Sequence, residues 1–129
     1  MLHYGFTDQG IESTFNTAKY WKNAPDIIHA SGGKSKGFSM EEKAFLFEKG
    51  SDQKLSFTIN ASKESPVVNP AFVIYNCDAD NPEVKINGTA VEEGKKLRIG
   101  RGYNTDGKPK TIIWIDLESV EPVSIDLSL

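Results

Sequence analysis

Acidic side chains are the first candidates for chemistry in this sequence. Asp78, Asp80 and Asn81 place three oxygen-bearing side chains close together, which is how a calcium-binding loop begins. Such a loop also needs a glycine at its sixth position and a glutamate at its twelfth, and the sequence has neither there. The pattern therefore favours an Asx-type turn, with calcium at Asp78 and Asp80 as the alternative.

A second acidic pair, Asp116 and Glu118, falls on alternate positions of a predicted strand and so shares one face, about 7 Å apart. A glycosidase instead places its two carboxylates on opposite sides of a sugar. Serine catalysis is not indicated either, because no serine lies in a Gly-x-Ser-x-Gly pattern. We therefore interpret Asp116 and Glu118 as surface charges and predict that the chain is not an enzyme, a small glycan hydrolase being the lesser alternative.

Signals for nucleotide, metal and disulfide chemistry are weak. The segment Gly32-Gly33-Lys34-Ser35 lacks the earlier glycine of a phosphate-binding loop. His3 and His29 are isolated, and Cys77 is the single cysteine, so neither a thiolate cluster nor an intrachain disulfide is available. Cys77 is interpreted as a small buried residue. We predict no cofactor and no metal.

Aromatic residues offer a more specific hypothesis. If Ile113, Ile115 and Leu117 face a core, Trp114 lies on the opposite face beside Ile112 and Asp116. A pyranose packs its apolar C–H face on such a ring while nearby polar side chains bond its hydroxyls. Tyr20, Trp21 and Tyr103 fall in segments predicted to be irregular, where binding side chains concentrate. The candidate ligand-binding residues are Trp114, Trp21, Tyr103 and Asp116.

The alternative for Trp114 is a ring that is covered by another sheet, a loop or a neighbouring domain.

The elements that would position these residues are mostly strands. Leu55, Phe57 and Ile59 alternate with polar residues, as in a half-buried strand. Residues 71–77 are apolar on both faces, which is typical of a central strand, and Asn87-Gly88 predicts a tight hairpin. Further strands are predicted at residues 26–30, 97–99, 111–118 and 123–128, and the apolar end of residues 41–48 favours a strand over a short helix.

Other segments are predicted to lack regular strands. Residues 31–37 are rich in glycine and lysine and are predicted to be a flexible loop. Residues 100–110 are predicted to be a long polar loop. Residues 1–25 form a less regular N-terminal segment, for which a short helix and a strand or loop are both open.

These elements predict an all-β fold, an antiparallel two-sheet β-sandwich of about eight or nine strands. The 129 residues suit one domain, residues 1–129. A net charge of −3 gives no electrostatic reason to bind nucleic acid. No apolar run is long enough to span a membrane, and no signal peptide is expected at the N-terminus.

Several strand and turn motifs resemble those of β-sandwich accessory domains in large exported bacterial polysaccharide-degrading proteins. The motifs are Asn69-Pro70-Ala71-Phe72-Val73-Ile74-Tyr75-Asn76, Val84-Lys85-Ile86-Asn87-Gly88, Arg98-Ile99-Gly100, Thr105-Asp106-Gly107 and Ile113 to Ser119. The resemblance covers roughly residues 25–128. It implies an extracellular or periplasmic setting and a catalytic domain elsewhere in the parent chain, and it carries over no binding residue.

Two hypotheses follow. The chain is a non-catalytic carbohydrate-binding or accessory module whose partner is a polysaccharide or oligosaccharide. Alternatively, it is a structural domain whose aromatic residues pack against a neighbouring domain or a second copy, with no ligand of its own.

Overall fold

The computed structural model describes residues 15–129 apart from positions 52, 80 and 95. In this part of the chain, twelve strands form two five-stranded sheets and one two-stranded ribbon. The strands are β1 (Ile27–Ser31), β2 (Gly33–Ser39), β3 (Ala44–Lys49), β4 (Lys54–Ile59), β5 (Val67–Val68), β6 (Ala71–Tyr75), β7 (Glu83–Ile86), β8 (Thr89–Val91), β9 (Leu97–Tyr103), β10 (Pro109–Ile115), β11 (Glu118–Ser119) and β12 (Val123–Ser128).

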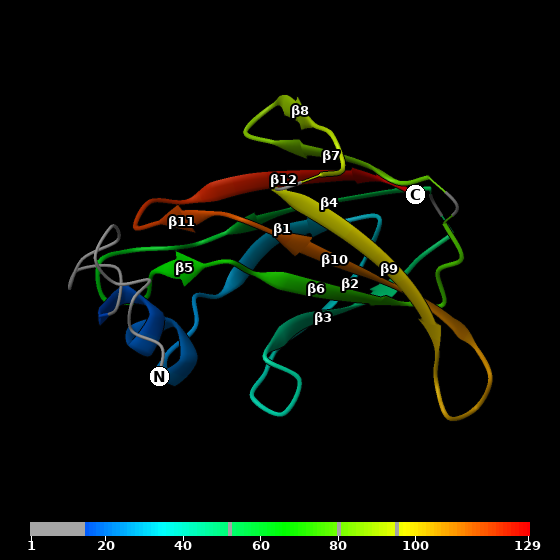
Figure 1. The fold of residues 1–129 in the computed structure, drawn as a ribbon, viewed down its shortest axis with the longest axis horizontal. Coiled ribbons are helices and arrows are strands. Elements are labelled where there is room, and N and C mark those ends of the chain that lie inside the picture. Colours follow the sequence, from blue (N-terminus) through cyan, green and yellow to red (C-terminus); the bar gives the residue numbers. More distant parts are fainter. Residues whose placement is uncertain (1–14, 52, 80, 95) are drawn as a thin grey trace.

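The two large sheets pack against each other in a sandwich-like arrangement (Figure 1). Sheet A has the order β1-β4-β12-β7-β8, and sheet B has the order β2-β3-β6-β10-β9. The short strands β5 and β11 pair with each other at one end of the sandwich. The all-β sandwich predicted from the sequence is therefore confirmed.

The core lies between the sheets because alternate residues of each strand point inward. Leu55, Phe57 and Ile59 of β4 are all at most 2% exposed, as their spacing predicts. Phe47 of sheet B stacks on Phe57 of sheet A, with ring centroids 4.4 Å apart. Cys77 is also buried in this core, as expected. This stacking contact between Phe47 and Phe57 packs the two sheets against each other.

One strand pair departs from the antiparallel pattern. β3 and β6 run parallel, with Phe45 beside Phe72 and Phe47 beside Ile74. The segment between them crosses to sheet A, where it forms β4. Sheet B is therefore a mixed sheet, and β6 is central in it, which agrees with the apolar residues on both of its faces.

The chain passes from sheet A to sheet B at Gly32, between β1 and β2. The φ angle of Gly32 is +86°, and a Cβ atom there would lie 1.8 Å from the carbonyl oxygen of Lys54. Only glycine fits such close contact between two main chains. This corner joins sheets A and B along one side of the sandwich.

Several local predictions are confirmed. The Asn87-Gly88 hairpin joins β7 and β8, and both residues have positive φ, 51° and 85°. The predicted strands at residues 26–30, 97–99 and 123–128 correspond to β1, β9 and β12.

Three local predictions are wrong. The flexible loop expected at residues 31–37 is mostly strand. β2 begins at Gly33, because Gly32 turns the chain and β3 then pairs with the segment. The long loop expected at residues 100–110 is shorter, since β9 continues to Tyr103 and β10 begins at Pro109. The strand expected over residues 111–118 is interrupted, because β10 ends at Ile115 and Glu118 begins β11.

The N-terminal part of the described chain is helical over residues 15–22. Tyr20 anchors this helix in the core, where its ring contacts the rings of Phe38 and Phe45. Residues 1–14 of the predicted N-terminal segment lie outside the described residues. No helix in the described part of the chain is long and apolar enough to cross a membrane.

Candidate functional site

The candidate site is the outer face of sheet B, the surface that points away from sheet A. Residues reach this face because every second position of each strand alternates with a core residue. The outer face consists of the outward residues of four strands. These are Ala44, Leu46 and Glu48 of β3, Ala71, Val73 and Tyr75 of β6, Lys110, Ile112 and Trp114 of β10, and Arg98, Gly100 and Gly102 of β9.

Trp114 is the prominent aromatic side chain on this face and is 44% exposed. Its neighbours Ile113 and Ile115 are 0% and 2% exposed, so the strand alternation predicted from the sequence holds here. Across the strands Trp114 is level with Ala71 on one side and Arg98 on the other.

The indole ring of Trp114 extends across β9. A Cβ atom built on Gly100 would lie 3.0 Å from Cζ3 and 3.1 Å from Cη2 of the ring. The ring thus lies over a position without a side chain, and a rigid sheet supports it from below. Such support reduces the freedom that an aromatic side chain loses when a ligand stacks on it.

Beside Trp114 the outer face is apolar. Ala44 and Val73 are only 2% and 5% exposed, although neither belongs to the core between the sheets. Leu46 and Ile112 are level with Val73 and are partly exposed. Together these side chains form an apolar floor next to the ring.

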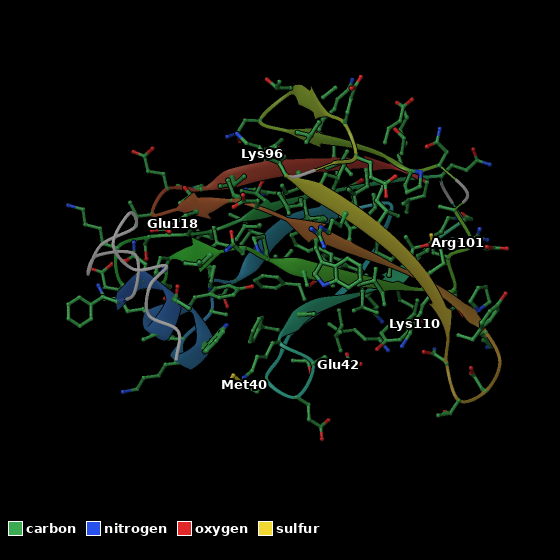
Figure 2. All side chains as sticks on the ribbon, in the orientation of Figure 1. Met40, Glu42, Lys96, Arg101, Lys110 and Glu118 are labelled. Carbon is green, nitrogen blue, oxygen red and sulfur yellow. The ribbon has the colours of Figure 1, made fainter. Side chains whose placement is uncertain are left out.

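Charged side chains surround this floor. Arg98 is exposed next to Trp114, and Lys110 lies on the same face four residues before it. Beyond Trp114, Asp116 donates its main-chain N–H to the carbonyl of Lys96, so these two residues are level across the strands. Figure 2 shows Lys96 at the start of β9 and Lys110 near the other end of the face.

Tyr75 is a second aromatic residue on the outer face, at the end near Lys110. Its hydroxyl donates a hydrogen bond to Glu42 Oε2 at 3.3 Å, and Lys36 Nζ lies 5.9 Å from its ring centroid. Partial burial, followed by the negative charge and hydrogen bond of Glu42, raises the pKa of Tyr75 above that of a free tyrosine. Tyr75 is therefore a neutral hydrogen-bonding group at neutral pH.

The structure brings together only two of the four residues selected from the sequence. Trp114 and Asp116 lie two residues apart at the same end of the outer face. Trp21 is on the N-terminal helix, where Lys43 Nζ lies 4.9 Å from its ring centroid. Tyr103 is the last residue of β9, where it pairs with Pro109 at the far end of the strand.

The expectation that Tyr20, Trp21 and Tyr103 lie in irregular segments is wrong. Tyr20 and Trp21 are helical, and Tyr103 ends a strand. Tyr20 is also buried, because its ring fills the end of the core beside Phe45.

The two acidic candidates have different surroundings. Asp116 lies between β10 and β11, whereas Glu118 Oε2 accepts a hydrogen bond from Asn16 Nδ2 at 2.9 Å. The prediction that they share one strand face is wrong, because the strand is interrupted between them. Asp78 forms an ion pair with Arg101, and Asp80 lies outside the described residues. Among the described residues no histidine, cysteine, aspartate or glutamate cluster could hold a metal ion.

Sequence reasoning missed Tyr75, Arg98 and Lys110 as site residues. Each lies at an outward position, but the face they share depends on β6, β10 and β9 being neighbours in that order. One signal was available, since Gly100 and Gly102 alternate with larger residues and leave space on one face of a strand.

A separate groove of about 450 Å³ lies between the β7–β8 hairpin and β9. Its floor is apolar, with Val84, Val91, Leu97 and Ile99, and its lining also includes Glu83, Lys85, Glu92 and Glu93. None of the described residues that line this groove is aromatic. We therefore favour the outer face of sheet B, where a rigid aromatic platform and convergent polar groups occur together.

No protein-family model, no curated protein and no solved structure matches this chain. The functional argument therefore depends on the site geometry.

Proposed function

We propose that the chain is a non-catalytic carbohydrate-binding module of an exported polysaccharide-processing protein, and that it binds sugar on the outer face of sheet B. The observation that carries this proposal is Trp114, an exposed ring supported by Gly100 and flanked by an apolar floor and charged side chains.

The chemistry of this face suits a sugar ring. A pyranose has an apolar face of C–H groups and a rim of hydroxyl groups. Its apolar face would stack on Trp114, while Arg98 donates hydrogen bonds and Asp116 accepts them at the hydroxyl rim. Tyr75 and Lys110 would contact further units of the same chain at the other end of the face.

Two single-tryptophan variants can test the proposal, because the chain contains only two tryptophans. Trp21→Phe leaves Trp114 as the reporter, and Trp114→Phe leaves Trp21 as a matched control. The two rings have similar exposure, 44% for Trp114 and 46% for Trp21, so acrylamide should quench both to a similar extent without ligand.

Each variant would be titrated with a panel of soluble plant, algal and host polysaccharides. We expect one class of glycan to protect Trp114 from acrylamide and to leave Trp21 unchanged. If no glycan protects Trp114, or if both rings respond equally, the outer face is not the sugar site.

A second candidate function is an interaction domain that packs on a neighbouring domain or a second copy. It is favoured by four exposed apolar side chains near the helix, Phe15, Trp21, Met40 and Val120, which are 62%, 46%, 57% and 37% exposed. The hydrogen bond from Asn16 to Glu118 and the contact of Lys43 with Trp21 bring their segments together.

Sedimentation of the wild-type chain would test this second candidate, with Phe15→Ser as the comparison. A dimer that dissociates in the variant would support an interface at the helix. A monomer at all concentrations would count against pairing of two copies.

A further inference from the structure

The charges around Trp114 narrow the class of sugar that this face could bind. Two cations, Arg98 and Lys110, lie on the outward side of β9 and β10, and Lys96 directly precedes β9. One carboxylate, Asp116, accompanies them. The chain as a whole has a net charge of −3, so this positive strip contrasts with the charge of the whole molecule.

The cations of the strip differ from Lys36 and Arg101 of the same sheet in having no acidic partner among the described residues. Lys36 is paired with Glu48 at 3.3 Å, and Arg101 is paired with Asp78. Among the described residues, Lys96, Arg98 and Lys110 form no ion pair, and the carboxylate of Glu42 at the other side of the face is bonded to Tyr75. The positive charge of the strip is thus available to a ligand.

The geometry of the two strands orders these charges around the ring. Arg98 is directly level with Trp114, and Lys110 is level with Gly102, four residues farther along β9. A Cβ atom on Gly102 would lie 3.4 Å from Lys110 Cε, so the lysine side chain extends toward β9. The strand rise places Arg98 and Lys110 about 13 Å apart along the strip.

We propose that the outer face of sheet B binds anionic polysaccharides, whose repeated carboxylate or sulfate groups pair with Arg98 and Lys110 while a sugar ring stacks on Trp114. This proposal rests on the carbohydrate-binding function proposed above. Arginine suits such a ligand because its planar guanidinium can bond the two oxygens of a carboxylate or sulfate at once. A spacing of about 13 Å fits two charges on one extended polymer better than two charges on one small molecule.

Affinity electrophoresis and calorimetry with three polymers would test the proposal. The probes are a polyuronate (polygalacturonate), a sulfated galactan (carrageenan) and a neutral galactan, each at low and high NaCl concentration. The variants are Arg98→Gln, Lys110→Gln and Trp114→Ala, and Lys85→Gln is the control because Lys85 is an exposed cation on sheet A. Unchanged thermal unfolding would show that each variant is folded.

We expect wild-type protein to bind at least one anionic polymer more tightly than the neutral one. Arg98→Gln and Lys110→Gln should each weaken this binding about five- to tenfold, Trp114→Ala should weaken it more, and Lys85→Gln should have no effect. A high NaCl concentration should also weaken the binding of the anionic polymer by the wild-type protein. Tighter binding of the polyuronate identifies carboxylate as the recognised group. Tighter binding of the sulfated galactan identifies sulfate.

Two results would overturn the inference in different ways. Trp114-dependent binding of the neutral polymer, with no effect of salt or of the two charge variants, would reject the anionic preference and keep the sugar-binding function. Binding of none of the three polymers, together with an unprotected Trp114, would reject the sugar-binding function itself.

Discussion

The six-membered ring of Trp114 on β10 lies over Gly100 on β9, so that a ring from one strand occupies the space of a missing side chain on the next. The two residues are not directly level, because Trp114 pairs with Arg98 and Gly100 pairs with Ile112. The contact is therefore diagonal, and it sets the orientation of the ring on the sheet.

Gly100→Ala should disturb the ring of Trp114. The new Cβ atom would lie 3.0 Å from the ring, which is closer than ordinary contact, so the ring must shift. We expect a loss of about 1 kcal/mol in the free energy of unfolding and greater acrylamide quenching of Trp114 in the Trp21→Phe background.

Gly102→Ala is the matched control, because it lies on the same strand and face and its Cβ atom would be 3.4 Å from Lys110 Cε. It should leave quenching unchanged and alter stability by less than about 1 kcal/mol. Equal effects of the two substitutions would show that the ring does not depend on Gly100.

Gly32→Ala should be severely destabilising. Its Cβ atom would overlap the carbonyl oxygen of Lys54, and main-chain atoms of a central strand cannot move away easily. We expect a loss of more than about 3 kcal/mol in urea unfolding.

Gly37→Ala separates this overlap from backbone strain. Gly37 also has positive φ, +82°, but a Cβ atom there meets nothing within 4 Å. Its substitution should cost only about 1–2 kcal/mol, the usual penalty for this backbone conformation. A similar loss for both glycines would mean that φ alone, and not the corner between the sheets, decides the effect.

Tyr20→Phe should stabilise the protein. The hydroxyl of Tyr20 is buried and has no hydrogen-bond partner among the described residues, so it loses its bonds to water on folding. Removing this hydroxyl should raise the free energy of unfolding by about 1 kcal/mol. Tyr75→Phe is the comparison, since the Tyr75 hydroxyl is bonded to Glu42 and its removal should give no such gain.

Alkaline pH should destabilise the wild-type protein through the same residue. Burial raises the pKa of Tyr20 well above the ordinary value of about 10, so the folded state retains the proton after the unfolded state has lost it. Ionisation of Tyr20 thus leaves the free energy of unfolding unchanged below about pH 10 and lowers it as the pH rises further. Urea unfolding between pH 8 and pH 11 should show a steeper loss in wild type than in Tyr20→Phe. Parallel curves would contradict this assignment.

Local pattern was sufficient to predict most of the strands. Leu55, Phe57 and Ile59 alternate without interruption, and Asn87-Gly88 permits few structures other than a tight turn. The pattern failed at β2, where glycine and lysine suit a loop but pairing with β3 overrides their local preference.

The site was predictable only in part. The alternation in β10 placed Trp114 on the outward side of the strand, because it depends on one strand, whereas Asp116 follows the end of β10. The positions of Tyr75 and Arg98 beside β10 depend on which strands become neighbours, and local spacing does not contain that information.

The parallel pairing of β3 with β6 has a kinetic consequence. Sheet B cannot be completed by joining successive hairpins, because β4 must cross to the other sheet before β6 can return beside β3. The entropy of closing this long loop has to be overcome before the contact of Phe45 with Phe72 forms. We therefore expect both sheets to appear in a single slow step, on the order of milliseconds to seconds, rather than one after the other.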